Sequence, residues 1–175
     1  MEADDAADLV NELPEERREP VLELLPYVQR RRLRALLGYD AATAGGLMSP
    51  DFVCVYAQAT KAEALARLLR SRAPAEALTW VFVMNEHKRL TGAIQLVDLL
   101  RADDGDQVGA MGGVPQRVHV DADLEEVARL MTDFDLTVAP VIDNEQRMVG
   151  VVTVDDVLEL LLPQGWRRHY GILGE

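Results

Sequence analysis

The chain contains little cysteine, few basic side chains and no long apolar run. A single cysteine, Cys54, leaves no partner for an intramolecular disulfide and no set of thiolates for a metal cage. The net charge of −12 argues against a nucleic-acid-binding surface, which needs clustered lysine and arginine. The longest apolar runs, such as residues 149–154, are far shorter than the roughly 20 residues that cross a bilayer.

Signatures of catalysis and of secretion are also missing from the sequence. Ser49 lacks a Gly-x-Ser-x-Gly context, and the chain has no phosphate-binding loop and no dinucleotide-binding fingerprint. His87 and His119 have no second histidine at the spacing of a zinc site. The N-terminus is acidic and lacks the basic and apolar regions of a signal peptide. We therefore expect a cytoplasmic protein that is not an enzyme.

The acidic residues are concentrated in the second half of the chain. Residues 108–162 carry 11 acidic and 3 basic side chains, a net charge of −8. Residues 48–107 have a net charge of −1, and residues 1–47 have a net charge of −4. About one third of the chain therefore holds two thirds of its net charge, and this asymmetry needs an explanation.

An internal repeat covers most of the sequence. Residues 83–100 align with residues 141–158 at an offset of 58, and residues 63–68 align with residues 125–130 at an offset of 62. The first copy is thus longer by four residues, which we place within residues 73–78. The identical pairs are Val83 and Val141, Arg89 and Arg147, Gly92 and Gly150, Asp98 and Asp156, and Leu100 and Leu158.

Both copies predict the same order of elements. A short strand is followed by an amphipathic helix, a β-branched strand, a polar turn, a second strand and a last helix. Such a unit is too small to cover both faces of its sheet, so the two copies should pack sheet against sheet in one pseudo-symmetric module of the mixed α+β class. We place the strands at 53–56, 80–84 and 90–95 and at 117–120, 138–142 and 148–153, and the last helices at 96–101 and 154–162. The amphipathic helices should bury Leu65, Leu68 and Leu69 in the first copy and Val127, Leu130 and Met131 in the second.

Residues 1–47 are patterned as short helices joined by tight turns, like a fragment of a helical repeat array. The first helix has an acidic first turn, and Pro14 stands where a second helix can begin. Pro20 costs about 3 kcal/mol inside a helix, so we expect the second helix to start late or to bend. The apolar stripes consist of Leu22, Leu25, Leu33, Leu36 and Leu37.

The repeat resembles a tandem pair of cystathionine-β-synthase-type (CBS) domains. The resemblance covers about residues 48–162 and includes the Gly-x-x-Thr-x-x-Asp sequence formed by Gly150, Thr153 and Asp156. On this basis we divide the chain into a helical segment at 1–47, a first CBS domain at 48–107, a second CBS domain at 108–162, and a tail or linker at 163–175.

With its helical segment, the chain resembles the cytosolic region of MgtE-type magnesium transporters. The stretch Ala44-Gly-Gly-Leu-Met-Ser-Pro50 is the most specific part of this resemblance. In that family a helical N domain, of which this chain has only the last repeat, and the CBS pair sense intracellular Mg²⁺ for a dimeric membrane pore. The resemblance implies a Mg²⁺-sensing regulatory region that forms a homodimer and, if the native chain continues past Glu175, contacts its own membrane domain. The charge balance given above predicts that it binds no nucleic acid.

The metal-binding positions of that family match seven carboxylates in this sequence. Mg²⁺ prefers oxygen ligands. Two unit charges about 4 Å apart repel each other by roughly 4 kcal/mol at an effective dielectric of 20, and an ion between them reverses the sign. A closed arrangement would then depend on Mg²⁺. The alternative explanations are helix capping for Asp123 and Glu125, and a solvated acidic face for the whole set. The seven residues are Asp4 and Asp8 on the helical segment, and Asp123, Glu125, Asp135, Asp156 and Glu159 on the second CBS domain.

The resemblance to CBS domains also implies an adenosine-nucleotide site at Asp98, Thr153 and Asp156. In CBS pairs the aspartate of the motif binds ribose and the hydroxyl residue reaches phosphate. The first copy has Gln95 in place of that hydroxyl residue, and Val97 stands where ATP-binding transporters of this type carry arginine. Loss of the arginine removes a charge-assisted contact, so we expect ATP binding to be weak or absent. Helix capping is the alternative role of the two aspartates. The alternative functions are a free-standing nucleotide-binding CBS protein and a purely structural dimerisation module.

Overall fold

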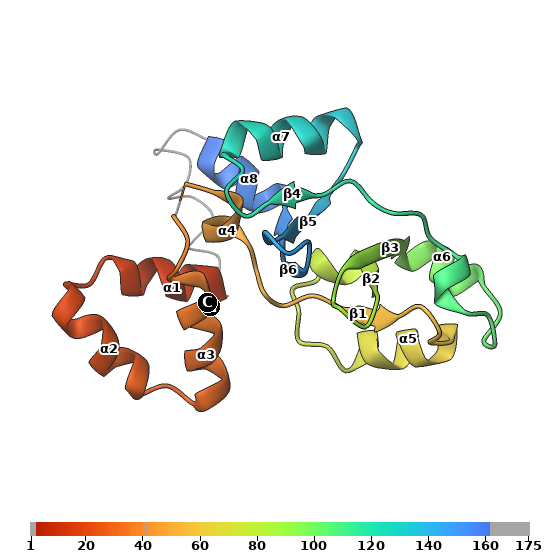
Figure 1. Ribbon diagram of the computed structural model, residues 1–175, viewed down its shortest axis with the longest axis horizontal. Coiled ribbons are helices and arrows are strands. Elements are labelled where there is room, and N and C mark those ends of the chain that lie inside the picture. Colours follow the sequence, from red (N-terminus) through yellow and green to blue (C-terminus); the bar gives the residue numbers. More distant parts are fainter. Residues whose placement is uncertain (1–2, 41, 162–175) are drawn as a thin grey trace, which may run out of the picture.

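The computed structural model describes residues 3–40 and 42–161, and places a group of helices beside two small sheets (Figure 1). The predicted tail, residues 163–175, lies outside the described residues. The helical segment consists of α1 (Ala3–Asn11), α2 (Glu15–Glu23), α3 (Tyr27–Leu36) and the short α4 (Ala44–Leu47).

Prolines start two of these helices, as the sequence predicts for the first of them. Pro14 precedes α2 and Pro26 precedes α3, each as the N-cap residue. Of the two effects expected of Pro20, a late start or a bend, the late start does not occur, because the helix begins at Glu15 and continues through Pro20. Pro20 lies at an exposed position, where water can reach the backbone that loses its hydrogen bond, and the buried Leu22 anchors the helix two residues later.

The two repeat copies form two three-stranded sheets with identical topology. In each sheet the first two strands are parallel and the last two are antiparallel. The predicted strands and last helices are confirmed to within two residues at each end, and the one-turn helix η1 (Ala77–Thr79) accounts for the extra residues of the first copy. The first copy contains β1 (Cys54–Tyr56), α5 (Lys61–Leu69), β2 (Trp80–Met84), β3 (Leu90–Gln95) and α6 (Leu96–Arg101). The second contains β4 (Val118–His119), α7 (Leu124–Asp133), β5 (Val138–Ile142), β6 (Met148–Thr153) and α8 (Val154–Leu161), and η2 (Val108–Ala110) lies between the copies.

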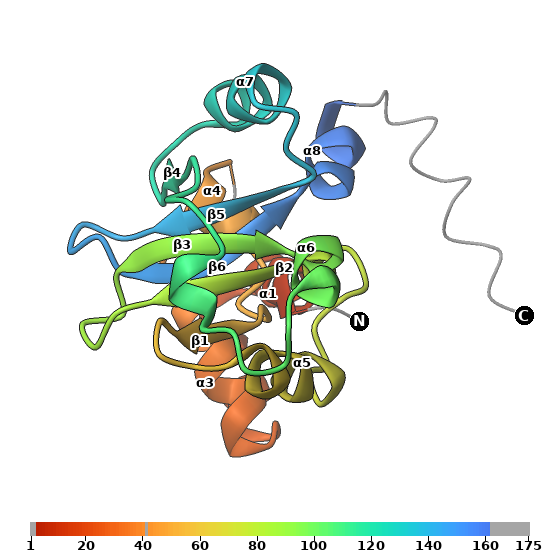
Figure 2. The same ribbon diagram turned by 90° about the vertical axis from the view of Figure 1, so that its right-hand side faces the viewer.

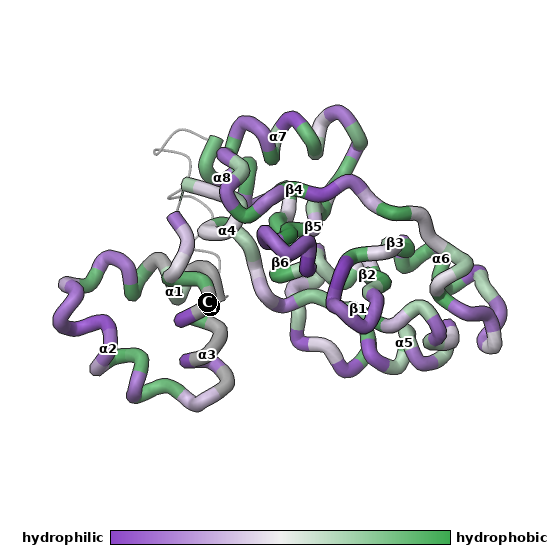
Figure 3. The backbone as a smooth tube through the Cα atoms, viewed as in Figure 1, coloured by the Kyte–Doolittle hydropathy of each residue, from purple (hydrophilic) through white to green (hydrophobic). Residues whose placement is uncertain are grey.

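The two sheets face each other in the middle of the module, with α7 and α8 on one side and α5 on the other (Figure 2). One apolar cluster joins them, built from Phe82 and Leu90 of the first sheet and Val138, Met148 and Val151 of the second. The predicted sheet-to-sheet packing of a tandem CBS pair is therefore confirmed. In Figure 3, α7 alternates between hydrophobic and hydrophilic stretches, as expected for an amphipathic helix that covers a sheet.

The segment that leads into each copy pairs with the sheet of the other copy. Ser49, ahead of β1, exchanges two backbone hydrogen bonds with Val151 of β6, with N–O distances of 2.8 and 2.9 Å. Gly113, ahead of β4, accepts a hydrogen bond of 3.1 Å from the amide of Ala93 in β3. The two copies are thus connected by exchanged leading segments as well as by their apolar interface.

The helical segment packs against the second copy. The amides of Ala44 and Gly45 in α4 donate hydrogen bonds of 2.8 Å to the carbonyls of Ala122 and Val120. Apolar residues of α1, α2 and α3 belong to the same buried cluster as the core of the second copy. One burial prediction fails in the first copy, since Leu69 is 75% exposed. Ala64 and Leu68 define the buried face of α5, and the next residue points about 100° away from it.

Candidate functional site

Asp123 stands at the start of α7, where the helical segment meets the second CBS copy. Its carboxylate accepts a hydrogen bond of 2.8 Å from the amide of Glu126, and its backbone bridges to Thr43. The capping role expected as the alternative for Asp123 is therefore present. Glu125 does not cap the helix, and instead pairs with Arg129 at 2.7 Å on the exposed surface of α7.

Asp135 and Glu159 are exposed carboxylates on the same copy. Asp135 lies just past the end of α7 with a φ of 52°, a left-handed conformation that aspartate tolerates better than most residues. Glu159 lies in α8, which packs against α7. Neither side chain has a described ion pair, so both carboxylates keep their oxygen atoms available for a ligand.

Asp156 is held in the first turn of α8 by the preceding threonine. Its carboxylate accepts hydrogen bonds from the amide of Thr153 at 2.8 Å and from the hydroxyl of Thr153 at 2.6 Å. The amide of Asp156 in turn donates to the threonine hydroxyl at 3.4 Å. Both residues predicted for metal or nucleotide binding at this position thus form a reciprocal helix cap.

The structure does not gather the predicted metal ligands into one cluster. Asp123 and Asp135 flank a ten-residue helix, which separates them by roughly 15 Å along its axis. Asp4 and Asp8 lie one turn apart in α1, but their side chains are outside the described residues. Among the side chains that the structure describes, which leave out those of Asp4 and Asp8, no group of three or more histidine, cysteine, aspartate or glutamate residues is arranged to hold a metal ion.

Asp98, the residue of the first copy that was predicted to bind nucleotide, is more exposed than Asp156. Asp98 lies in the first turn of α6, with 61% of its side chain exposed, and faces Arg101 at 3.5 Å. Gln95 precedes the helix without capping it through its side chain. Val97 is 45% exposed and offers no charge to a phosphate group. The first copy therefore presents one carboxylate, which is suitable for a ribose hydroxyl, and an aliphatic side chain where a cation would be needed.

An ion pair in the turn between β5 and β6 was not predicted from the sequence. Asp143 is only 8% exposed, and its carboxylate accepts a hydrogen bond of 2.7 Å from Nε of Arg147. Its other oxygen accepts hydrogen bonds from the amides of Glu145 and Arg147. Burial raises the pKa of Asp143, but the hydrogen bonds and charge of Arg147, together with the hydrogen bond from the amide of Glu145, outweigh burial and hold that pKa below its usual value.

Tyr39 links this turn to the helical segment. Burial, followed by the nearby charges of Asp143 and Asp121, raises the pKa of its hydroxyl. The ring of Tyr39 lies against Gly45, where an added Cβ would approach a ring carbon to 2.6 Å. The sequence did contain a signal for the Asp143–Arg147 ion pair. The turn ends in arginine in both copies, but only in the second copy does it begin with aspartate.

Family models match nearly the whole chain. The model described as the MgtE intracellular N domain matches residues 1–42, and the model described as the CBS domain matches residues 44–105 and 111–163. The match to an intracellular domain confirms the predicted cytoplasmic location. In the part of the chain that the structure describes, no helix has the length and apolar character needed to cross a bilayer.

Individual relatives agree with the family models. The chain is 45% identical over 141 residues to the magnesium transporter MgtE of Thermus thermophilus, an alignment that covers 79% of this chain and 31% of the relative. It is 40% identical to the cytosolic domain of the Mg²⁺ channel MgtE solved in complex with ATP, with a TM-score of 0.85 over 91% of this chain and 66% of that one. The soluble part of a magnesium transporter is 31% identical, with a TM-score of 0.83 over 92% of this chain and 63% of that one.

The present chain spans about a third of the length of its curated relatives. Its helical segment aligns with the N domain and its two sheets align with two CBS domains, in the same order. The resemblance seen in the sequence is confirmed: the chain belongs to the CBS domain family, and its helical segment followed by a CBS pair is the cytosolic arrangement of an MgtE-type magnesium transporter.

Proposed function

We propose that this chain is the Mg²⁺-sensing regulatory region of an MgtE-type magnesium transporter or channel, on the cytosolic side of the membrane. The observation that carries the proposal is the carboxylate excess of the second CBS copy, a net charge of −8 over residues 108–162. Most of the exposed members of this excess lie on α7, at its two ends and on α8, and Glu145 lies in the turn between β5 and β6. Its relatives, which include a Mg²⁺ channel and a magnesium transporter, support Mg²⁺ as the ion.

The predicted carboxylates would bind Mg²⁺ between two surfaces, each of which supplies some of the ligands. Since the described residues form no metal cluster of their own, an ion at Asp135 or Glu159 needs further ligands. These would come from another surface, such as Asp4 and Asp8 of the helical segment or a second copy of the chain. Without Mg²⁺ the acidic surfaces repel each other, and with Mg²⁺ they attract, so the ion shifts the population towards a closed state.

Exposed apolar side chains support a homodimer, in which a second copy of the chain supplies the other surface. Leu100 of α6 and Leu158 of α8 occupy the same position of the two repeat copies and are 54% and 48% exposed. Val97 and Leu161 add to this exposed surface on the same two helices. An apolar face repeated on both halves of a pseudo-symmetric module is suited to a symmetric interface with a second copy.

Calorimetric titration of MgCl₂ into the chain, at a constant high NaCl concentration, tests the metal proposal. Asp135→Asn is the most informative variant, because asparagine also tolerates the left-handed backbone of this position and is nearly the same size. We expect this variant to lose at least part of the Mg²⁺ binding seen with the unaltered chain. The matched control is Asp133→Asn, an exposed carboxylate two residues away that is not in the predicted set. Equal loss in both variants, or no binding heat at all, would contradict the proposal.

A nucleotide-regulated CBS protein is the second candidate function. Two observations favour it: a relative 40% identical to this chain was solved in complex with ATP, and Asp98 is exposed at the position expected for a ribose contact. Val97 weighs against tight binding, because a phosphate group has no cation at that position. Of the two candidates, Mg²⁺ sensing has the larger number of suitably exposed ligand atoms.

A further inference from the structure

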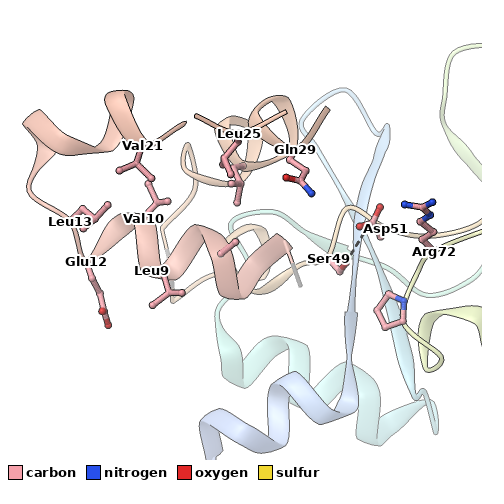
Figure 4. A pocket seen from close by; sticks show the side chains of 13 residues that line it. Leu9, Val10, Glu12, Leu13, Val21, Leu25, Gln29, Ser49, Asp51 and Arg72 are labelled. Carbon is pink, nitrogen blue, oxygen red and sulfur yellow. Dashed lines mark hydrogen bonds between the residues drawn. The ribbon is translucent and has the colours of Figure 1, made fainter. Parts of the chain in front are cut away.

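A cavity of about 750 Å³ lies between the helical segment and the first CBS copy. Its volume is within the range of pockets that bind small organic molecules. One end is walled by aliphatic side chains of α1 and α2 and of the turns that follow them, among them Val10, Leu13, Val21 and Leu25 (Figure 4). Val21 and Leu9, which both line the cavity, are 36% and 54% exposed. Apolar surface is therefore left uncovered here.

The other end of the cavity is polar. Ser49, Asp51 and Arg72 come together there, across the cavity from Val10 and Val21 (Figure 4). A second hollow of about 680 Å³ shares Asp51 and Arg72 with the first and adds Arg67 and Arg70 to the lining. None of the ion pairs among the described side chains involves these three arginines. Around the second hollow they outnumber the one carboxylate in its lining, that of Asp51, so a chain with a net charge of −12 has a local excess of positive charge here, which favours an anion.

Ser49 supplies a buried hydrogen-bond donor at this polar end. The residue is 2% exposed, and its hydroxyl oxygen accepts a hydrogen bond of 3.3 Å from the amide of Asp51. Among the atoms that the structure describes, no hydrogen bond is donated by that hydroxyl. Buried polar groups are normally paired, so a buried hydroxyl that lines a cavity and lacks an acceptor points to a ligand atom that supplies one.

We propose that this cavity binds a single-chain amphipathic anion. The hydrocarbon chain lies against Val10, Leu13 and Val21, and the carboxylate or phosphate group accepts from Ser49 and faces Arg72. The neighbouring Arg67 and Arg70 extend the cationic end. The ligand would touch both the helical segment and the first CBS copy, and would therefore hold them in one relative position. This inference concerns a different surface from the Mg²⁺ sites and does not depend on them.

Calorimetry with decyl phosphate, below its micelle concentration and in EDTA, tests the proposal with the whole chain. We expect saturable binding, together with a rise in melting temperature. Arg72→Gln should weaken binding about tenfold or more, since it removes a charge-assisted contact. Val21→Glu should abolish binding by placing a charge in the apolar wall. The matched controls, Arg117→Gln and Leu24→Glu, change exposed residues outside the cavity and should bind like the unaltered chain.

Two further probes test the contributions of the anionic group and of the hydrocarbon chain separately. Inorganic phosphate should bind far more weakly than decyl phosphate, because it lacks the chain. Decyltrimethylammonium should not bind, because it has the chain with the opposite charge. Equal binding of this cation would show a nonselective apolar surface and overturn the proposal. Absence of binding by decyl phosphate would also overturn it, and would leave the cavity to a protein segment or to a second copy.

Discussion

Arg89 and Arg147 form a backbone bridge with each other, although they are 58 positions apart and occupy the same place in the two repeat copies. The amide of Met148 donates a further hydrogen bond of 3.1 Å to the carbonyl of Lys88. Equivalent residues that meet in an antiparallel bridge lie on a two-fold axis. The pseudo-symmetry axis of the module therefore passes between the two hairpin turns, which also share a left-handed residue, with φ values of 61° at Lys88 and 64° at Gln146.

The two turns differ in charge at their first residue, and this difference predicts the effect of Asp143→Asn. In the first turn, the side chain of Asn85 accepts hydrogen bonds from two backbone amides. They are equivalent to the two amides that donate to Asp143 in the second turn. Asparagine should thus preserve the turn and remove only the charge. At pH 7 we expect the melting temperature to fall by about 2–4 °C, as measured by circular dichroism. The reverse change, Asn85→Asp, should not lower it, because Arg89 has the same place in the first turn that Arg147 has in the second.

The pH dependence of the same pair has a defined direction. The pKa of Asp143 is lower in the folded chain than its unfolded value of about 3.9. The pair therefore stabilises the fold above about pH 4, and this contribution is lost as the pH falls through the folded pKa. The difference in melting temperature between the unaltered chain and Asp143→Asn should be constant at neutral pH and shrink below pH 4. A difference that persists unchanged at pH 2.5 would contradict this account.

The exchanged leading segments predict unequal effects at two adjacent glycines. A Cβ on Gly112 would lie 2.2 Å from the carbonyl oxygen of Ala93, whereas a Cβ on Gly113 would meet nothing within 4 Å. We expect Gly112→Ala to destabilise the fold by about 1–3 kcal/mol in urea denaturation, because the backbone must shift. Gly113→Ala is the matched control and should leave the midpoint nearly unchanged. Equal effects would mean that the segment is not fixed against the first sheet.

Much of the fold could be predicted from the sequence because each element of the repeat occurs twice, so each copy supports the assignment made in the other. The β-branched strands and the repeat at an offset of 58 were enough to place both sheets and their contact. The exchange of leading segments was not predictable, since Ser49 and Gly113 take part in it through their backbone atoms, and their side chains do not indicate which strand they pair with. The start of α2 after Pro14 was predictable, but the sequence left open whether Pro20 delays or bends this helix, and the helix is not delayed.

The candidate site was less predictable than the fold. A sequence shows which carboxylates exist but not whether the fold already uses them, as it uses Asp123 and Asp156 for helix caps. The Asp143–Arg147 pair was overlooked because its turn looked like a solvated loop. The cavity beside Ser49 is formed by segments distant in sequence, and no local pattern reports such a surface.

Nucleotide binding should be weak in this chain and recoverable by one substitution. Val97→Arg places a cation one residue before Asp98 in α6, where a phosphate group would need it. We expect ATP, titrated in EDTA, to bind the unaltered chain weakly or not at all, and to bind Val97→Arg about tenfold more tightly or better. Val114→Arg, at another exposed valine, serves as the control. A dissociation constant near 1 μM for the unaltered chain would favour the nucleotide-regulated alternative.

The exposed apolar faces of α6 and α8 predict the effect of charge on self-association. Sedimentation of the chain at tens of micromolar with Mg²⁺ should give twice the mass of one chain. Leu100→Glu and Leu158→Glu should shift the equilibrium towards monomer, because each places a charge in the proposed interface. Leu24→Glu, at a leucine 85% exposed on the helical segment, should not. A monomer of the unaltered chain under these conditions would count against the regulatory proposal.

The most direct test of Mg²⁺ sensing compares melting temperatures in MgCl₂ and NaCl at equal ionic strength. Simple screening treats the two salts alike. Specific binding adds about 1.4 kcal/mol at ten times the dissociation constant, so we predict a higher melting temperature in millimolar MgCl₂. Glu159→Gln should raise the melting temperature without Mg²⁺, by relieving repulsion, and should reduce the Mg²⁺-dependent increase. Equal melting temperatures in the two salts, or an unchanged increase in Glu159→Gln, would show that these carboxylates are only a solvated face.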